Sequence, residues 1–414
     1  MSVTAETARA VEQSSNASPA PGRKESSRLR SLDWIERLIA FNTVSRESNL
    51  GLIETIRDHL AQHGIASTLT YDSGRNKANL FATIAAANGA TQGGVVLSGH
   101  TDVVPVDGQQ WDSDPFQPVI RDGKLFGRGS CDMKGYIGVV LTALPELFAT
   151  KLDKPVHFAF SYDEEIGCVG APSMIAELQE RGIRPDGCIV GEPTSMRPIV
   201  AHKSISSFRC CVNGHATHSS LTPKGVNAIE YAARLICHIR DIADGLKRNG
   251  PFDEDFDVPF STASTGIIHG GIAVNTVPAN CEFTFEYRTL PAVDSHKLIE
   301  QIEAYARDIL VPEMRKVAPH ASIEFQQRSM SPSLEASEQD AITQLVRALT
   351  ANRETHKVAY GTEAGLFQRA GIPSVICGPG DIEQAHKPNE FVLLDQIAQC
   401  EAFIAKLVRS MTVA

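Results

Sequence analysis

Four short stretches of the chain, at residues 95–97, 156–160, 188–190 and 375–377, are almost entirely apolar, with His157 as the one polar interruption. A strand with one face in water alternates apolar and polar residues, whereas a continuous apolar run is typical of a strand buried on both faces. These runs therefore predict parallel strands in the middle of a sheet.

Helical patterns separate these strands. Apolar residues recur at helical spacing over residues 32–41, 136–148, 173–181 and 339–351. Alternation of buried strands and helices indicates a doubly wound α/β domain, in which helices cover both faces of a mostly parallel sheet.

The pattern changes between residues 203 and 327. The expected elements there are a strand (207–212), a helix (226–243), two strands (266–269 and 281–288), a helix (295–309) and a strand (322–327). This β-α-β-β-α-β order predicts a small two-layer α+β domain inserted into the larger one. The expected division is a disordered tail at 1–28, a catalytic domain formed by 29–202 and 328–414, and an inserted domain at 203–327.

Composition and charge exclude several classes of protein. The 414 residues carry a formal net charge of −10, whereas a nucleic-acid-binding protein needs a basic face, so we expect no nucleic-acid partner. No run approaches the ~18 apolar residues of a membrane span, so no membrane partner is expected. The nine cysteines are an odd number without a C-x-x-C pair, which favours free thiols in a reducing compartment. Because residues 1–28 carry no secretory pattern, the expected location is the cytoplasm.

Five side chains of metal-ligating type stand after predicted strands or in glycine-marked turns. They are His100, Asp132, Glu165, Glu192 and His386. Open α/β sheets place their sites outside the carboxyl ends of the strands, so these residues are expected to share one pocket. Structural zinc sites use mainly cysteine and histidine. Three carboxylates with two histidines instead predict a site for metal-assisted hydrolysis.

Two further carboxylates accompany these ligands. Asp102 stands two residues after His100 and can orient that imidazole through its second nitrogen. Glu164 directly precedes Glu165, and a free carboxylate there can accept a proton from metal-activated water and pass it to a leaving nitrogen. Plainer interpretations stay open, since the first motif also fits a surface turn and the second a solvated acidic turn.

Asp132 stands just ahead of a predicted helix that starts near Gly135. A carboxylate in this place is a common helix N-cap. It can also bridge two metals with one oxygen to each, because two-metal hydrolytic sites hold their ions roughly 3.5–4 Å apart.

Seven segments together resemble the co-catalytic zinc aminoacylase and carboxypeptidase family. They are SGHTDVVPV, GRGSCDMKG, SYDEEIG, GEPT, GHATHSS, YGTEAGLFQRAGIPSVICGPG and QAHKPNEFV. The resemblance implies that His100 and Glu192 bind one metal, that Glu165 and His386 bind the other, and that Asp132 bridges them. It also implies two Zn²⁺ ions per subunit, for which Co²⁺ can substitute.

The same resemblance assigns further roles. Asp102 would support His100, and Glu164 would be the general acid and base. The inserted domain would act as a lid and would mediate a homodimer. His218 matches a family histidine that comes from the lid to stabilise the oxyanion, with His215 of the same motif as its rival.

Two residues concern the substrate. Arg288 ends a predicted strand and can clamp a carboxylate with its guanidinium fork, with a surface ion pair as the alternative. Glu363 could meet a cationic side chain such as that of ornithine, or serve only as a carboxylate at a helix N-terminus.

The expected activity follows from the resemblance, which is greatest to the acetylornithine deacetylases of the family. It implies removal of the acetyl group from N2-acetylornithine in arginine biosynthesis, to give ornithine and acetate. The alternatives are a related N-acyl-amino-acid deacylase, a dipeptidase or a glutamate-type carboxypeptidase with the same chemistry. A metal-holding binding protein is a different class, and it would need neither Glu164 nor His218.

Overall fold

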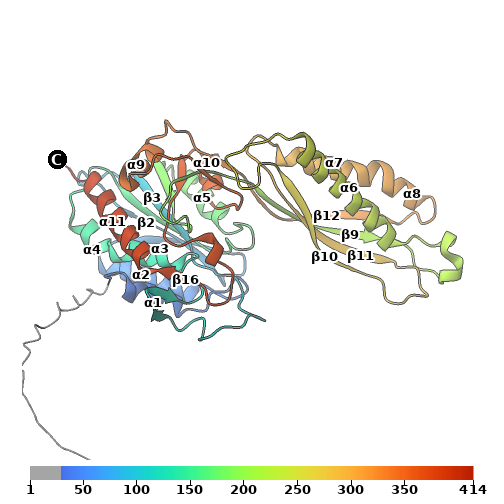
Figure 1. Ribbon diagram of the computed structural model, residues 1–414, viewed down its shortest axis with the longest axis horizontal. Coiled ribbons are helices and arrows are strands. Elements are labelled where there is room, and N and C mark those ends of the chain that lie inside the picture. Colours follow the sequence, from blue (N-terminus) through green and yellow to red (C-terminus); the bar gives the residue numbers. More distant parts are fainter. Residues whose placement is uncertain (1–28, 414) are drawn as a thin grey trace, which may run out of the picture.

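The computed structural model describes residues 29–413, and the tail predicted at 1–28 lies outside the described residues. Figure 1 shows two bodies joined end to end. The larger body is built on a nine-stranded sheet and the smaller one on a four-stranded sheet.

The four central strands of the large sheet are parallel. They lie in the order β6 (Val156–Ser161), β3 (Val95–His100), β7 (Gly187–Val190) and β15 (Ser374–Ile376). Each overlaps one of the apolar runs, so the prediction of buried parallel strands is confirmed. The sheet as a whole is mixed, because mostly antiparallel strands flank this centre: β1 (Ser67–Tyr71), β2 (Ala78–Ile84), β8 (Ile199–His202), β13 (Leu334–Glu335) and β14 (His356–Val358).

Helices cover both faces of this sheet, which confirms the doubly wound α/β class. Successive residues of β3 face opposite layers, since Leu97 packs in one hydrophobic core and Val96 in the other. The first layer holds α1 (Leu32–Ile39), α2 (Leu50–Gln62), α3 (Lys134–Thr142), α4 (Leu144–Ala149), α9 (Ala341–Thr350) and α11 (Leu394–Ser410), and the second holds α5 (Ala171–Glu180) and α10 (Ala364–Arg369).

The helix predicted at 136–148 is two helices, α3 and α4, which meet at Ala143. Pro145 stands in the first turn of α4. Proline lacks an N–H, and its ring crowds the carbonyl four residues earlier, so it fits a first turn but not a helix interior.

A three-stranded sheet brings two loops of the larger body together. It consists of β4 (Val119–Arg121), β5 (Lys124–Phe126) and β16 (Phe391–Leu393). Phe126 of β5 lies opposite Phe391 of β16 in an antiparallel pair. The loop that follows β5 therefore runs beside the loop between η3 (Ile382–Gln384) and β16.

The smaller body has the predicted β-α-β-β-α-β order. Residues of β9 (Ile205–Asn213) alternate between buried and half-buried, so one face of the sheet packs against helices. The other elements are η1 (Ser219–Lys224), α6 (Ala228–Asn249), β10 (Thr262–Gly270), β11 (Asn280–Arg288), α7 (Ser295–Tyr305), η2 (Ala306–Leu310), α8 (Val311–Arg315) and β12 (Ser322–Ser331). The inserted α+β architecture is confirmed, whereas the domain limits at 203 and 327 stay a prediction.

Two expectations from composition can be compared with the structure. Within residues 29–413, no helix has both the length and the apolarity that a membrane crossing requires. All nine cysteines lie in this range, and each is a free thiol.

The buried His202, the last residue of β8, generates a prediction about acid stability. Its Nδ1 donates a hydrogen bond to the carbonyl oxygen of Lys203 at 2.8 Å, and burial lowers the pKa of the imidazole to about 4. An unfolded chain binds this proton near pH 6.5, so the contribution to stability is present above that pH and is lost as the pH falls toward 4.

We predict that His202 accounts for a loss of about 2 kcal/mol in unfolding free energy between pH 7 and pH 5. The His202→Asn variant cannot titrate in this range, so it should lose less stability than the wild type. Denaturant unfolding of both proteins at both pH values measures the difference. Equal losses in the two proteins would contradict the prediction.

Candidate active site

The five predicted ligands lie together at the carboxyl ends of the central strands. His100 is the last residue of β3, and Glu192 follows shortly after β7. Glu165 follows β6, Asp132 precedes α3, and His386 follows η3. Residues from widely separated parts of the sequence thus meet at one edge of the sheet, as open α/β sheets place their sites.

Asp132 lies between the two histidines. Its Oδ1 is 2.9 Å from Nε2 of His100, and its Oδ2 is 3.4 Å from Nε2 of His386. Nε2 of His386 is also 2.9 Å from Oε2 of Glu165, and Nε2 of His100 is 3.7 Å from Oε1 of Glu192. Each histidine, with its own glutamate, thus faces a different oxygen of Asp132. A carboxylate placed in this way could offer one oxygen to each of two ions.

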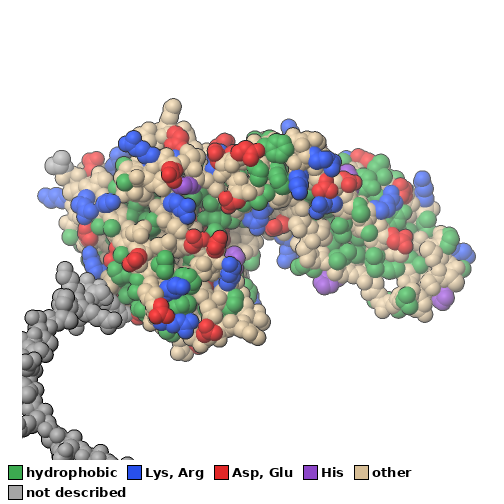
Figure 2. All heavy atoms as spheres, viewed as in Figure 1, with side chains coloured by type: hydrophobic (Ala, Val, Ile, Leu, Met, Phe, Trp, Pro, Cys, Tyr) green, Lys and Arg blue, Asp and Glu red, His purple; other side chains and the backbone are tan. Residues whose placement is uncertain are grey.

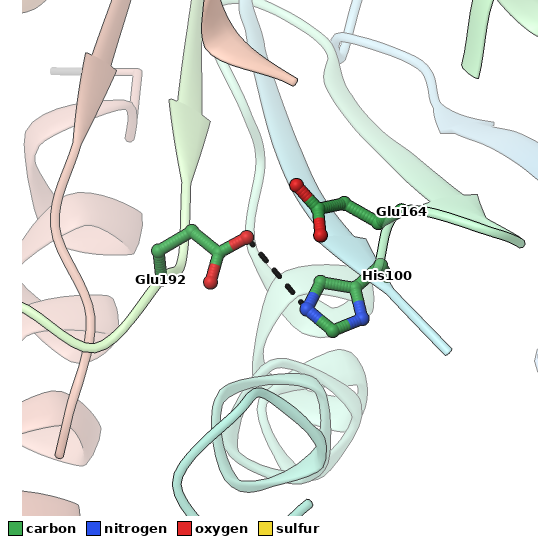
Figure 3. Close-up of side chains that lie close together, drawn as sticks. All are labelled: His100, Glu164 and Glu192. Carbon is green, nitrogen blue, oxygen red and sulfur yellow. Dashed lines mark ion pairs between the residues drawn. The ribbon is translucent and has the colours of Figure 1, made fainter. Parts of the chain in front are cut away.

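Glu164 approaches the same space from the side opposite Glu192 (Figure 3). One ligand atom each of His100, Glu164 and Glu192 lies within 4.8 Å of the other two. Asp132 and Glu165 form a second such group with His100. The distances therefore permit Glu164 to act either as a ligand or as a carrier of protons.

The sequence predicted that the Asp102 side chain orients the imidazole of His100, but the shorter contact comes from the backbone of Asp102. Nδ1 of His100 lies 2.9 Å from the backbone carbonyl oxygen of Asp102, whereas the Asp102 carboxylate is 3.6 Å away. That carboxylate accepts hydrogen bonds from Oγ of Ser45 at 2.7 Å and from the backbone N–H groups of Glu164 and Glu165 at 3.0 and 3.3 Å. Asp102 thus orients the imidazole with its backbone and fixes the acidic loop with its side chain.

Four carboxylates, which we call the carboxylate cluster, crowd this buried space: Asp132, Glu164, Glu165 and Glu192. Burial and neighbouring acids raise the pKa of Glu164 to about 8 and that of Glu165 to about 7. Hydrogen bonds with Asp132 and Glu165 raise the pKa of His386 to about 10. Such shifts arise when like charges share a poorly solvated site that lacks compensating cations.

The donor set fits metal ions. Oε1 of Glu165 is buried and has no hydrogen-bond partner among the described residues. An orphaned carboxylate oxygen is costly unless a cation or a donor meets it. Carboxylate oxygens and imidazole nitrogens are the ligands of catalytic zinc, which supports a metal centre here.

The plainer interpretations of these motifs do not match the geometry. Met133, and not Asp132, is the N-cap of α3. In the acidic loop, Asp163 forms an ion pair with Lys77, whereas Glu164 is buried and Glu165 faces His386. The loop is therefore not simply a solvated turn.

A cleft of about 750 Å³ connects this site with the smaller body. It is lined by the carboxylate cluster, His386 and Tyr360 on one side, and by Glu286, Arg288 and Arg328 on the other. In Figure 2 the molecule narrows where the two bodies meet. The second wall thus holds two guanidinium groups and one carboxylate, and the guanidinium groups would suit a small substrate that carries a carboxylate.

Arg288 and Glu363 differ in their access to this cleft. Arg288 lines it and also forms an ion pair with Glu286, with 3.2 Å between Nε and Oε1. Glu363 is 1% exposed, and its carboxylate accepts hydrogen bonds from Ser98 at 3.2 Å and from Ser161. It occupies the N-cap position of α10 without capping it through its side chain. Direct contact of Glu363 with a substrate therefore has no support in this conformation.

His218 lies outside the cleft. It is an exposed residue that precedes η1, and its Nδ1 accepts a hydrogen bond from the backbone N–H of Ser220 at 3.2 Å. The η1 segment, yellow-green in Figure 1, lies at the end of the smaller body farthest from the larger one. The rival His215 contacts His320 in an edge-on ring pair and does not line the cleft either.

Cys168, Tyr360 and Arg328 are among the residues at the site that were not predicted from the sequence. The thiol Sγ of Cys168 lies 3.2 Å from Oε1 of Glu164, and Tyr360 and Arg328 line the cleft. Arg328 lies at a register shift in β12, and such a bulge re-aims a side chain out of the regular alternation. Strand periodicity therefore carries no signal for its position.

Comparison with known proteins identifies the family. Residues 96–410 match the model of Peptidase family M20/M25/M40. The chain belongs to this family. It is 35% identical to the acetylornithine deacetylase of Pasteurella multocida (strain Pm70) over 384 residues, which cover 91% of this chain and 97% of that protein. It is also 35% identical to the acetylornithine deacetylase of Shigella sonnei (strain Ss046), covering 84% of this chain and 87% of that protein.

A solved structure agrees with the fold. The M20 family metallo-carboxypeptidase Sso-CP2 from Sulfolobus solfataricus superposes with a TM-score of 0.72 at 17% identity, over 92% of this chain and 98% of that one. This M20 chain is therefore a metal-dependent hydrolase that acts on amide bonds.

The raised pKa values predict how metal removal affects stability. In the metal-free protein, Glu164 and Glu165 hold protons that the unfolded chain releases above about pH 4.3. Their stabilising contribution is therefore present below that pH and is lost as the pH rises through about 7 to 8. Bound cations replace these protons, so the difference in melting temperature between zinc-loaded and metal-free protein should widen from pH 5.5 to pH 8. A constant or narrowing difference in thermal melts would contradict this account.

Proposed function

We propose that the chain is a zinc-dependent deacetylase that hydrolyses N2-acetylornithine to ornithine and acetate in arginine biosynthesis. The observation that carries the proposal is the 35% identity to two acetylornithine deacetylases over most of the chain. The position of Asp132, with one oxygen toward each histidine, supports two-metal chemistry. We further propose that the enzyme acts in the cytoplasm.

Two Zn²⁺ ions are proposed as the cofactor, with Co²⁺ as a substitute. His100 and Glu192 would hold one ion, Glu165 and His386 the other, and Asp132 both. When bound, such ions polarise an amide carbonyl and lower the pKa of water toward about 7.

Glu164 is the proposed carrier of protons. It accepts a proton from the water that adds to the acetyl carbonyl carbon. It then donates that proton to the amide nitrogen as the C–N bond breaks, so that acetate and a free α-amine leave. A buried carboxylate within reach of the proposed ligands suits a group that must accept and donate a proton in turn.

Arg288 is the proposed partner of the substrate α-carboxylate. Its guanidinium lines the cleft opposite the metal site, and a guanidinium fork binds a carboxylate bidentately. Glu363 remains a proposed specificity residue. Because it is buried beside Ser98 and Ser161, it would favour the cationic side chain of ornithine through its negative charge.

His218 remains the proposed oxyanion donor. It is exposed and does not line the cleft, and η1, which follows it, lies at the end of the smaller body farthest from the larger one (Figure 1). It can therefore reach the substrate only after closure of the smaller body or from a second copy of the chain. A homodimer is supported by apolar side chains on and just after the edge strand β10, where Ile268 is 49% and Ile272 90% exposed. Monomeric proteins seldom leave such apolar groups together in water.

The alternative substrates are other N-acyl amino acids, dipeptides and C-terminal glutamate conjugates. The same site would cleave their amide bonds. We would measure kcat/KM on a panel of these compounds with the zinc-loaded protein, following acetate or amine release. The highest value is expected for N2-acetylornithine. A higher value for a dipeptide or a glutamate conjugate would refute the proposed substrate but not the chemistry.

Replacing Glu164 tests the mechanism. Glu164→Ala removes the proton carrier and leaves the five proposed ligands in place, so kcat should fall ~10²–10⁴-fold or more. Metal content, measured by elemental analysis, should stay at the wild-type value. The matched variant Glu165→Ala should lose metal instead. If Glu164→Ala loses metal as readily as Glu165→Ala, Glu164 is a ligand and the assignment is wrong.

A further inference from the structure

A buried ion pair lies between the two loops that carry Asp132 and His386. Nη1 of Arg128 is 2.7 Å from Oε2 of Glu390, and both side chains are 1% exposed. Neither residue belongs to the carboxylate cluster. A buried ion pair is weak evidence for a stabilising role, because desolvation of both charges offsets their attraction. The contacts around this pair indicate a different role.

Glu390 holds the backbone of Asp132. Its Oε1 accepts hydrogen bonds from the backbone N–H groups of Cys131 at 2.9 Å and of Asp132 at 3.1 Å. The N–H of Gly127 also donates to the backbone carbonyl oxygen of Glu390 at 3.0 Å. The position of the shared aspartate therefore depends on the loop that carries His386.

Arg128 holds the backbone of the His386 loop. Its Nη1 donates to the carbonyl oxygen of Lys387 at 3.3 Å, and its Nη2 donates to Oε1 of Gln109 at 2.6 Å. Nε2 of Gln109 in turn donates to the carbonyl oxygen of His386 at 2.9 Å. Two successive carbonyls of this loop are thus tied to one buried guanidinium, one of them through Gln109.

The His386 loop needs such support. His386 and Asn389 adopt left-handed backbone conformations, with φ of 64° and 58°, which are unfavourable for most residues other than glycine. The side chain of His386 is 53% exposed, so packing contributes little to its position. The imidazole contacts Asp132 and Glu165 at its tip, and hydrogen bonds to the loop backbone fix the position from which it reaches them.

We propose that Arg128 and Gln109 are positioning residues that place His386 relative to Asp132, and so set the affinity of one of the two metal positions. This inference rests on the proposed two-metal function. The position affected is the one that uses Glu165 and His386. The position that uses His100 and Glu192 shares Asp132, whose backbone is held by Glu390, the partner of Arg128. Gln109 contacts the backbone of His386 and not Glu390, so Gln109→Leu is the variant that separates the two positions.

The test is calorimetric titration of Zn²⁺ into metal-free wild type and into the Gln109→Leu and Arg128→Met variants. Loss of a group that orients a ligand typically lowers metal affinity 10–100-fold. In Gln109→Leu, one of the two affinities should fall by about this factor while the other stays at the wild-type value. Arg128→Met should lower the same affinity at least as far, and it also leaves Glu390 beside Asp132 without its partner. Gln109 is only half-buried but accepts a hydrogen bond from the buried Arg128, so metal-free Gln109→Leu should lose less melting temperature than metal-free Arg128→Met.

Arg347→Met is the matched control. Arg347 is also a mostly buried arginine that donates to a backbone carbonyl, that of Glu354 at 2.8 Å. It lies outside the cleft lining. This variant should lower the melting temperature without changing either affinity.

Two results would overturn the inference while leaving the metal centre intact. In the first, the wild type binds two ions, and both affinities of the variants equal those of the wild type. The second is an equal fall in both affinities of Gln109→Leu, which would indicate a general structural defect. A wild type that binds fewer than two ions would overturn the proposed two-metal function, and this inference with it.

Discussion

Four buried carboxylates repel one another at the candidate active site, and the other properties of the site depend on how this repulsion is offset. Asp132, Glu164, Glu165 and Glu192 crowd around His100, and burial alone already disfavours the charged form of each. Protons relieve the crowding in part, as the raised pKa values of Glu164 and Glu165 indicate. Divalent cations would relieve it fully and would also supply the chemistry, so the same electrostatic demand links stability, metal binding and hydrolysis.

The fold places these acids close together by bringing them from the ends of different strands. Parallel strands end at one edge, so β3, β6 and β7 each deliver ligands to one place without long excursions of the chain. The remaining two ligands come from loops that the pairing of β5 with β16 sets side by side. The rigid sheet fixes His100, whereas His386 depends on hydrogen bonds between loops. The two proposed metal positions would therefore differ in rigidity.

The sequence predicted what depends on local patterns. Continuous apolar runs located the four central strands, and ligand types after those runs located the site. The outer strand β1 carries no such run and was missed. The strand β8 was missed although its first three residues are apolar. Contacts between distant residues were also beyond reach: Glu363 bonds to Ser98 and Ser161, and Arg328 is turned into the cleft at a bulge. The position of His218 depends on how the two bodies are arranged, and no local pattern records that.

The central claim is that the carboxylate cluster holds two ions that share Asp132. Anomalous diffraction from crystals grown with Zn²⁺ tests it most directly. The account predicts two peaks roughly 3.5–4 Å apart, one beside His100 and Glu192, the other beside Glu165 and His386, with one oxygen of Asp132 toward each. A single peak, or an ion that Glu164 ligates in place of Glu165, would contradict it.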